Sequence, residues 1–180
     1  MTPAEFIQLK AFARIDGALM AAIWTGSFAC YIAGTASPML MICGMGMAVG
    51  SLLFAHTRLR NFRDTALEGT ISFGRAYAYA MLIFFYAAIL FAIAQFIYFQ
   101  YIDNGYIVSK MTEMINIPQN RQMIEAYGLA ESMDESLKMM AGTRAIDYAL
   151  NYLTVNITIG IIAGLPMALL ARTGGRTEQR

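Results

Sequence analysis

Four polar residues near the end of the chain have a spacing that places them on one helical face. Asp147, Asn151, Thr154 and Thr158 follow one another at intervals of four, three and four residues, which is the repeat of one face of an α-helix. Carboxylate, amide and hydroxyl groups on one face can bind a neighbouring helix, a ligand or an ion. Because the residues around them are mostly apolar, these four groups, here called the polar stripe, require polar partners.

Gln95 and Ser27 lie in two other apolar runs. Counted from the outer end of its run, each lies about as far in as the polar stripe does in its own. A buried hydrogen-bonded cluster is the interpretation we favour, with each contact worth about 1 kcal/mol or less. The alternative is a hydrophilic cleft that binds a small ligand or a lipid headgroup. Ion or proton conduction is a weaker alternative, because a relay needs ionisable groups at mid-membrane and only Asp147, near the edge, qualifies.

Two pairs of glycines have the spacing that permits close helix approach. Gly46 and Gly50 form one GxxxG pattern, and Gly160 and Gly164 form the other. Such patterns predict helix packing within the bundle, with dimerisation as the alternative. Pro166 follows the second pair and predicts a kink, because proline removes one helical hydrogen bond.

Three arginines, Arg58, Arg60 and Arg63, alternate with the apolar Leu59 and Phe62. This arrangement suits a segment that lies at the headgroup level against anionic lipid. The same charges also serve as topological signals.

Enzyme chemistry finds little support in the sequence. His56 is the single histidine and is expected at the inner interface, so no histidine-based triad has an acid and a base placed together. The methionines, including Met111 and Met114, can bind copper(I) in principle, but methionine is commonly an apolar filler. We therefore expect no cofactor, no metal and no catalytic residue. Cys30 and Cys43 lie in apolar runs and are expected to be free thiols, with pairing between them left open.

The elements that must position these residues are membrane helices. The chain of 180 residues is 58% hydrophobic and 14% charged, with a mean hydropathy of +0.50, whereas soluble domains are roughly 25% charged. A net charge of +1 gives no reason to expect a nucleic acid as partner. Lipid is the expected surrounding.

Charge-free runs locate four spans. Residues 17–55 carry no Asp, Glu, Lys or Arg, a length that suits two crossings of about 20 residues each. The break falls at 34–38, where glycine and Pro38 end one helix and begin the next. We predict spans at about 17–34, 38–56, 76–102 and 147–171, in a single all-α membrane domain over residues 1–180.

The distribution of positive charge predicts the orientation. One side collects Lys10, Arg14, Arg58, Arg60, Arg63, Arg75, Arg172, Arg176 and Arg180. On the other side, the segment 103–147 has more acidic than basic residues. Because cytoplasmic loops retain Lys and Arg, both termini are expected in the cytoplasm.

The loop at about 103–144 is too long for a turn and predicts short extracytoplasmic helices. Pro118 and Gly128 mark helix boundaries within it. Ser132 and Glu135 have the spacing of a capping box, and Gly142 offers a helix stop. The sequence therefore predicts a helix that begins at Ser132.

The residues Arg63-Asp64, and then the run GTISFGRAY at 69–77, carry a family resemblance. The chain resembles the bacterial membrane family known as domain of unknown function 4199, associated with the Bacteroidota. The resemblance covers most of the chain and implies no functional residue, since the family has no assigned activity. The resemblance also implies a neighbouring gene for a polyprenyl-phosphate-type glycosyltransferase, and hence a role in envelope-glycan assembly.

We therefore expect a non-catalytic accessory or scaffold protein of the inner membrane, with membrane lipid around it and a membrane-protein partner or a second copy as its contact. The competing expectation is a binder or carrier that takes a small ligand or lipid headgroup into an outer polar cleft.

Overall fold

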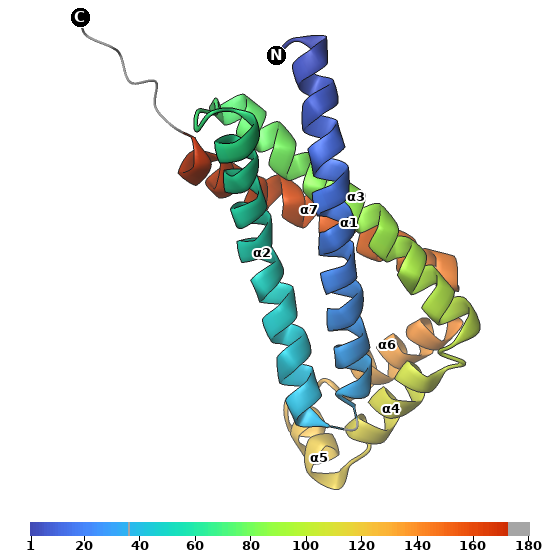
Figure 1. Cartoon of the computed structure of the whole chain (residues 1–180). Coiled ribbons are helices and arrows are strands. Elements are labelled where there is room, and N and C mark those ends of the chain that lie inside the picture. The colour runs from blue at the N-terminus through green and yellow to red at the C-terminus, as the bar shows by residue number, and fades with distance from the viewer. Residues whose placement is uncertain (36, 173–180) are drawn as a thin grey trace, which may run out of the picture. The chain divides into compact units, whose positions relative to one another are not determined.

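The structure is a computed structural model that describes residues 1–35 and 37–172. Figure 1 shows the helices in chain order, and none of these residues forms a strand. The helices are α1 (Pro3–Ala33), α2 (Pro38–Ala66), α3 (Phe73–Tyr101), α4 (Tyr106–Ile115), α5 (Pro118–Ala126), α6 (Ala130–Gly142) and α7 (Ala145–Ala171). By length and composition, α1, α2, α3 and α7 can each cross a membrane. The predicted fold class, a helical membrane protein with four long apolar helices, is confirmed.

The first two long helices extend beyond the apolar runs that revealed them. Helix α1 begins at Pro3, where a capping box joins the backbone N–H of Glu5 to the Thr2 hydroxyl (3.3 Å) and the N–H of Thr2 to the Glu5 carboxylate (2.7 Å). Helix α2 runs on to Ala66. The end of a charge-free run therefore marks where apolar surroundings stop, while the helix itself continues to its cap.

The segment between α3 and α7 holds three short helices, as its length and punctuation predict. Helix α6 ends at Gly142 but begins at Ala130, with Leu129 at the cap position. The capping box predicted at Ser132 is wrong, because the Ser132 hydroxyl donates to the Leu129 carbonyl (3.0 Å). Ser132 already lies in the first turn of α6, so its backbone is helical and it cannot be the N-cap residue.

The chain divides into two compact units. The first comprises Met1–Ile93 and the chain from Asn151 onward, and the second comprises Ala94–Leu150. Helices α3 and α7 each contribute to both units. Arg176 and Arg180, which entered the orientation argument, lie outside the described residues. The single domain expected for residues 1–180 stays a prediction.

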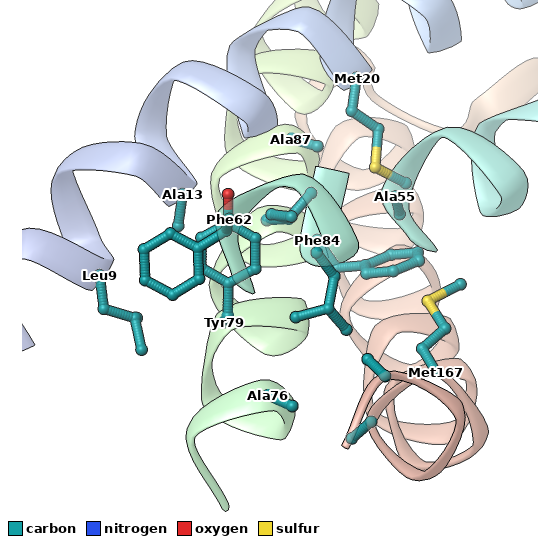
Figure 2. Packing of buried hydrophobic residues seen from close by; sticks show 14 of the residues in the cluster. Leu9, Ala13, Met20, Ala55, Phe62, Ala76, Tyr79, Phe84, Ala87 and Met167 are labelled. Carbon is teal, nitrogen blue, oxygen red and sulfur yellow. The ribbon is translucent and has the colours of Figure 1, made fainter. Parts of the chain in front are cut away.

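The core of the first unit is formed by side chains from α1, α2, α3 and α7. Figure 2 shows Leu9 and Ala13 of α1 beside the rings of Phe62 and Tyr79, with Met167 of α7 on the other side. Phe62 and Tyr79 stack with their ring centroids 4.3 Å apart. About 39% of the apolar stretch of α3 is buried, against 17% of that of α2. Helix α3 is therefore central, and α2 leaves most of its surface outward.

Candidate functional site

An acidic side chain lies buried among three helices of the first unit. Asp16 of α1 is only 1% exposed. Its Oδ1 accepts a hydrogen bond from Nε of Arg58 on α2 (2.6 Å), and its Oδ2 accepts one from the hydroxyl of Tyr79 on α3. Both oxygens of the carboxylate are thus satisfied, as a buried charge requires. This cluster, here called the Asp16 site, joins α1, α2 and α3.

The Asp16 site changes the role of one predicted lipid-binding residue. Sequence reasoning placed Arg58 at the lipid headgroups, whereas the structure places it in an ion pair with a side chain 42 positions earlier. The charge-free run that begins at residue 17 left Asp16 outside the predicted span. Its pairing with Arg58 carries no local sequence signal, because the two residues come together only when α1 packs against α2.

The other two arginines of that segment differ from each other. Arg63 pairs with Asp64 (2.6 Å), and its Nη1 donates to the carbonyl of Ala171 (3.0 Å) at the end of α7. A cation at a helix C-terminus satisfies a free carbonyl and opposes the helix dipole. Arg60 is exposed and makes no ion pair within the described part of the chain, so it alone among the three remains available to lipid.

The polar stripe lies on the surface of α7. Asn151, Thr154 and Thr158 are exposed, and the Thr158 hydroxyl donates to the Thr154 carbonyl of its own helix (2.9 Å). Asp147 pairs with Arg144, whose Nε lies 2.8 Å from its carboxylate. The stripe is a helical face on which Asp147 and Thr158 bond to groups three or four residues away in the chain.

The two residues assigned to the same depth as the stripe have separate surroundings. The Ser27 hydroxyl donates to the Gly44 carbonyl (2.7 Å) and so joins α1 to α2. Gln95 belongs to the second unit, is fully buried, and has no hydrogen-bond partner for either amide atom among the residues that the structure covers. Gln95 is therefore a polar group that the described chain leaves unsatisfied.

The second glycine pair, Gly160 and Gly164, lies where α7 packs against α3. A Cβ added to Gly160 would lie 2.7 Å from Cγ of Phe84, and one added to Gly164 would lie 3.2 Å from the Tyr77 ring. Helix α7 thus approaches α3 closely at these positions, just before Pro166, which lies inside α7. In this turn the Tyr77 hydroxyl donates to the carbonyl of Ile161 (3.3 Å).

Helix α2 approaches α1 through a different glycine from those predicted. A Cβ on Gly44 would lie 2.9 Å from the Ser27 carbonyl oxygen. A Cβ on Gly46 or Gly50 would meet no atom of the described chain within 4 Å. The first GxxxG pair therefore does not pack within the described bundle, because it faces away from the side of α2 that carries Gly44.

The second unit contains a cavity of about 410 Å³. It is lined by Phe99, Asp103, Gly105, Ile107, Val108, Ser109, Met140, Ala141, Thr143, Ala145 and Tyr148. Phe99 and Tyr148 stack with centroids 4.4 Å apart, and the Tyr148 hydroxyl donates to the Met140 carbonyl (2.8 Å). A cavity lined by two aromatic rings and by the polar residues Ser109 and Thr143 has the composition to hold a small polar ligand.

Asp103 supplies the one buried charge of this cavity. It is 8% exposed and accepts hydrogen bonds from the backbone N–H groups of Gly105 (3.1 Å) and Ile107 (3.2 Å) and from the Tyr98 hydroxyl (3.1 Å). The carboxylate therefore caps the start of α4. Sequence reasoning used Asp103 as a loop boundary and as one of the acidic residues of the outer segment, although Asp-Asn-Gly is also a typical turn that bonds its own backbone.

No site of another kind emerges from the residues described. They contain no group of three or more His, Cys, Asp or Glu residues arranged to hold a metal ion. Cys30 and Cys43 are free thiols, and Cys43 is exposed.

Comparison with known proteins identifies one family that covers most of the chain. A family model described as "Protein of unknown function (DUF4199)" matches residues 15–173. No curated protein and no solved structure matches the chain.

Proposed function

The chain belongs to the DUF4199 family of proteins of unknown function, and we propose that it is a non-catalytic accessory or scaffold protein that binds another membrane protein through the outward face of α2. The observation that carries the proposal is the open surroundings of Gly46 and Gly50. With Cys43 they recur at intervals of three and four residues, so the three share one face.

This outward face lies opposite the face of α2 that packs in the bundle. The packed face holds the buried Gly44, Ser51 and Ala55. On the outward side, Ile42 is 67% exposed and Leu53 is 70% exposed.

Small residues flanked by branched apolar ones let two membrane helices approach closely. Dispersion contacts and weak hydrogen bonds between backbones then stabilise the pair. In a membrane, apolar exposure alone predicts no partner, because lipid covers it equally well. Two glycines one turn apart, which leave a groove in the helix surface, favour a helix as the occupant of that groove.

The free thiol of Cys43 provides the experiment. In membranes that contain a Cys30→Ser variant, a mild oxidant or a short bismaleimide should link Cys43 to the polypeptide that lies against α2. A product of twice the chain's mass identifies a second copy. A product of another mass identifies a different membrane protein, and a polyprenyl-phosphate-type glycosyltransferase is the partner class that the family resemblance implies.

The specificity of the linkage is tested by filling the groove. Gly50→Leu should abolish the product, because its side chain projects between the two helices. Gly142→Leu, at a glycine of α6 with equally open surroundings, is the matched control and should leave the product unchanged. Absence of a Cys43 product in the Cys30→Ser background, or its persistence in Gly50→Leu, would contradict the proposal.

We also propose that the protein resides in the bacterial inner membrane with both termini in the cytoplasm. The support is the excess of Lys and Arg at the ends of the spans that include Lys10, Arg14, Arg60 and Arg75, set against the acidic segment 103–147. The helices α4, α5 and α6 would then lie on the extracytoplasmic side.

A binder or carrier is the second candidate function, favoured by the 410 Å³ cavity around Asp103. Mass spectrometry of the protein purified in mild detergent should then detect a bound small molecule or lipid. Ala141→Phe, at an exposed residue of the cavity wall, should reduce this species without lowering the melting temperature. Equal amounts of the species in both proteins would remove the cavity as its site.

A further inference from the structure

A second, smaller hollow lies between α1 and α3 in the first unit. It has a volume of about 180 Å³ and is lined by Ile7, Lys10, Ala11 and Arg14 of α1 and by Tyr86 of α3. The four α1 residues recur at intervals of three, one and three, so they form one face of the helix. Two of the five lining side chains are cationic, and none is acidic.

Gly17 explains why Tyr86 reaches this face. A Cβ on Gly17 would lie 2.7 Å from Cβ of Tyr86 and 2.9 Å from the carbonyl oxygen of Ile83. Helix α3 therefore passes against the bare backbone of α1 one turn beyond Arg14. Long side chains on a helix point back toward its N-terminus, which directs the Tyr86 ring along α1 toward Arg14 and Lys10. Its hydroxyl has no protein partner among the described residues.

The acids of α1 do not neutralise the bases of the hollow. Helix α1 contains two carboxylates, Glu5 and Asp16. Glu5 pairs with Arg75 (3.2 Å), and Asp16 pairs with Arg58 (2.6 Å). Both carboxylates are thus engaged by arginines from other helices.

Lys10 and Arg14 are left with uncompensated charge. Within the described chain neither makes an ion pair. The Lys10 ammonium lies 4.9 Å from the centroid of the Phe6 ring, a contact that leaves its N–H donors free. Two adjacent cations without a counter-charge, beside a free hydroxyl donor, have the chemistry of an anion site.

We propose that this hollow binds a phosphate group, with Arg14 and Lys10 supplying the charge and the Tyr86 hydroxyl donating a further hydrogen bond. A guanidinium binds two phosphate oxygens at once, and an ammonium adds a point charge. Ile7 and Ala11 give the hollow an apolar wall, which suits the glycerol and first methylenes of a phospholipid. The phosphate can therefore belong to a lipid headgroup or to a small soluble phosphate.

The site is independent of the α2 face proposed for helix association, because none of its lining residues lies on α2. It also replaces the assignment of headgroup binding to Arg58 and Arg63, both of which are occupied by protein partners.

The first experiment measures binding to the purified full chain in detergent. Native mass spectrometry follows titration with phosphatidylglycerol, and a parallel titration uses inorganic phosphate as competitor. The wild type should bind one phosphatidylglycerol saturably. The double variant Lys10→Gln and Arg14→Gln should bind it at least about tenfold more weakly, since two charge-assisted contacts are lost. The matched control, Lys138→Gln with Arg172→Gln, removes the same charge from exposed positions and should change binding less than twofold.

The two sources of phosphate give different results. Displacement of phosphatidylglycerol by millimolar inorganic phosphate supports a site that also takes a soluble phosphate. Binding that resists such competition supports a lipid headgroup. Absence of saturable binding in both titrations overturns the proposal. An equal loss of affinity in the control double variant also overturns it, because the loss would then follow from the lower net charge of the protein.

Tyr86→Phe supplies the second test, because it removes one oxygen atom and keeps the ring that forms the wall of the hollow. If the hydroxyl donates to phosphate, binding should weaken about three- to tenfold with an unchanged melting temperature. Unchanged binding by a folded Tyr86→Phe variant would overturn the site as proposed, since diffuse attraction to surface charge does not depend on this hydroxyl.

Discussion

At the residue scale, the Asp16 site is asymmetric in its exposure to solvent. The Asp16 side chain is 2% exposed, whereas the Arg58 side chain is 31% exposed. A charge left alone in a buried place costs several kcal/mol, and one that can reach water or headgroups costs much less. Loss of the arginine should therefore harm the fold more than loss of the acid.

We expect Arg58→Met to lower the free energy of unfolding by about 2 to 4 kcal/mol, because it strands the Asp16 carboxylate. Asp16→Asn should cost about 1 kcal/mol, since the amide can still accept from Tyr79. The double variant should be more stable than Arg58→Met alone. Unfolding in detergent can be followed by the fluorescence of Trp24, the single tryptophan, which packs against Phe84 and Phe91. An equal cost of the two single variants would contradict the asymmetry.

At the element scale, the close packing of α7 against α3 depends on Gly160, which has no side chain. In most helix interiors, Gly→Ala adds stability of up to about 1 kcal/mol. At Gly160 the sign should reverse, because the new Cβ would overlap Phe84, with 2.7 Å to its Cγ. At a glycine on the outward face of α2, Gly→Ala should still raise the free energy of unfolding or leave it unchanged.

Gly160→Ala is therefore expected to lower the free energy of unfolding by about 1 to 3 kcal/mol through overpacking. Gly46→Ala, where a Cβ meets nothing within 4 Å, is the matched control and should be neutral or stabilising. Melting temperatures of the two variants in one detergent decide the point. Equal melting temperatures would mean that α3 and α7 do not meet at Gly160.

Helices α5 and α6 of the second unit are joined by a bidentate ion pair. Arg121 of α5 donates from Nη1 and Nη2 to the two carboxylate oxygens of Asp134 on α6 (2.9 and 3.2 Å), and from Nε to Glu125 (3.0 Å). The hydrogen bonds from Arg121 hold the pKa of Asp134 below its ordinary value. A folded-state pKa that is depressed gives stability that is present above the ordinary pKa and lost as the pH falls through the lowered one.

The distance between α5 and α6 should accordingly be well defined at neutral pH and broaden as the pH falls through the lowered pKa of Asp134. Spin labels attached at Gln122→Cys and Met139→Cys, in a chain with both native cysteines replaced, report this distance by double electron–electron resonance spectroscopy. The Asp134→Asn variant should show the broad distribution at every pH. A pH response that survives in Asp134→Asn would assign the effect to Glu125 or to another group.

The part of the fold readable from sequence was the part that a local pattern determines. Charge-free runs located four long helices, and periodicity correctly placed Asn151, Thr154 and Thr158 on one face. Periodicity cannot say which way a face looks, and this one is exposed. The Asp16–Arg58 pair joins residues 42 apart, so no local pattern reveals it. A charge-free run marks only the apolar part of a helix, so the run that begins at residue 17 did not reveal the start of α1, although Thr2 and Glu5 have the spacing of a capping box.

At the scale of the whole molecule, orientation depends on which ends of the spans retain positive charge. The loop between α2 and α3 follows Arg58, Arg60 and Arg63, whereas the segment of α4 to α6 has more acidic than basic residues. Some of the basic groups are occupied, Arg58 by Asp16 and Arg63 by Asp64. The positive-inside rule counts Lys and Arg and gives little weight to Asp and Glu, so these pairs do not weaken the signal.

Single cysteines at Glu68 and Glu125, both exposed, should therefore react differently in a chain with Cys30 and Cys43 replaced by serine. A maleimide that cannot cross membranes, added to intact spheroplasts, should label Glu125→Cys and leave Glu68→Cys unlabelled. After lysis both should react, which controls for the accessibility of each thiol. The reverse pattern in intact spheroplasts would invert the topology and place the hollow of Lys10 and Arg14 on the extracytoplasmic side. Labelling of both before lysis would show that residues 68 and 125 face the same side, which requires a different number of crossings between them.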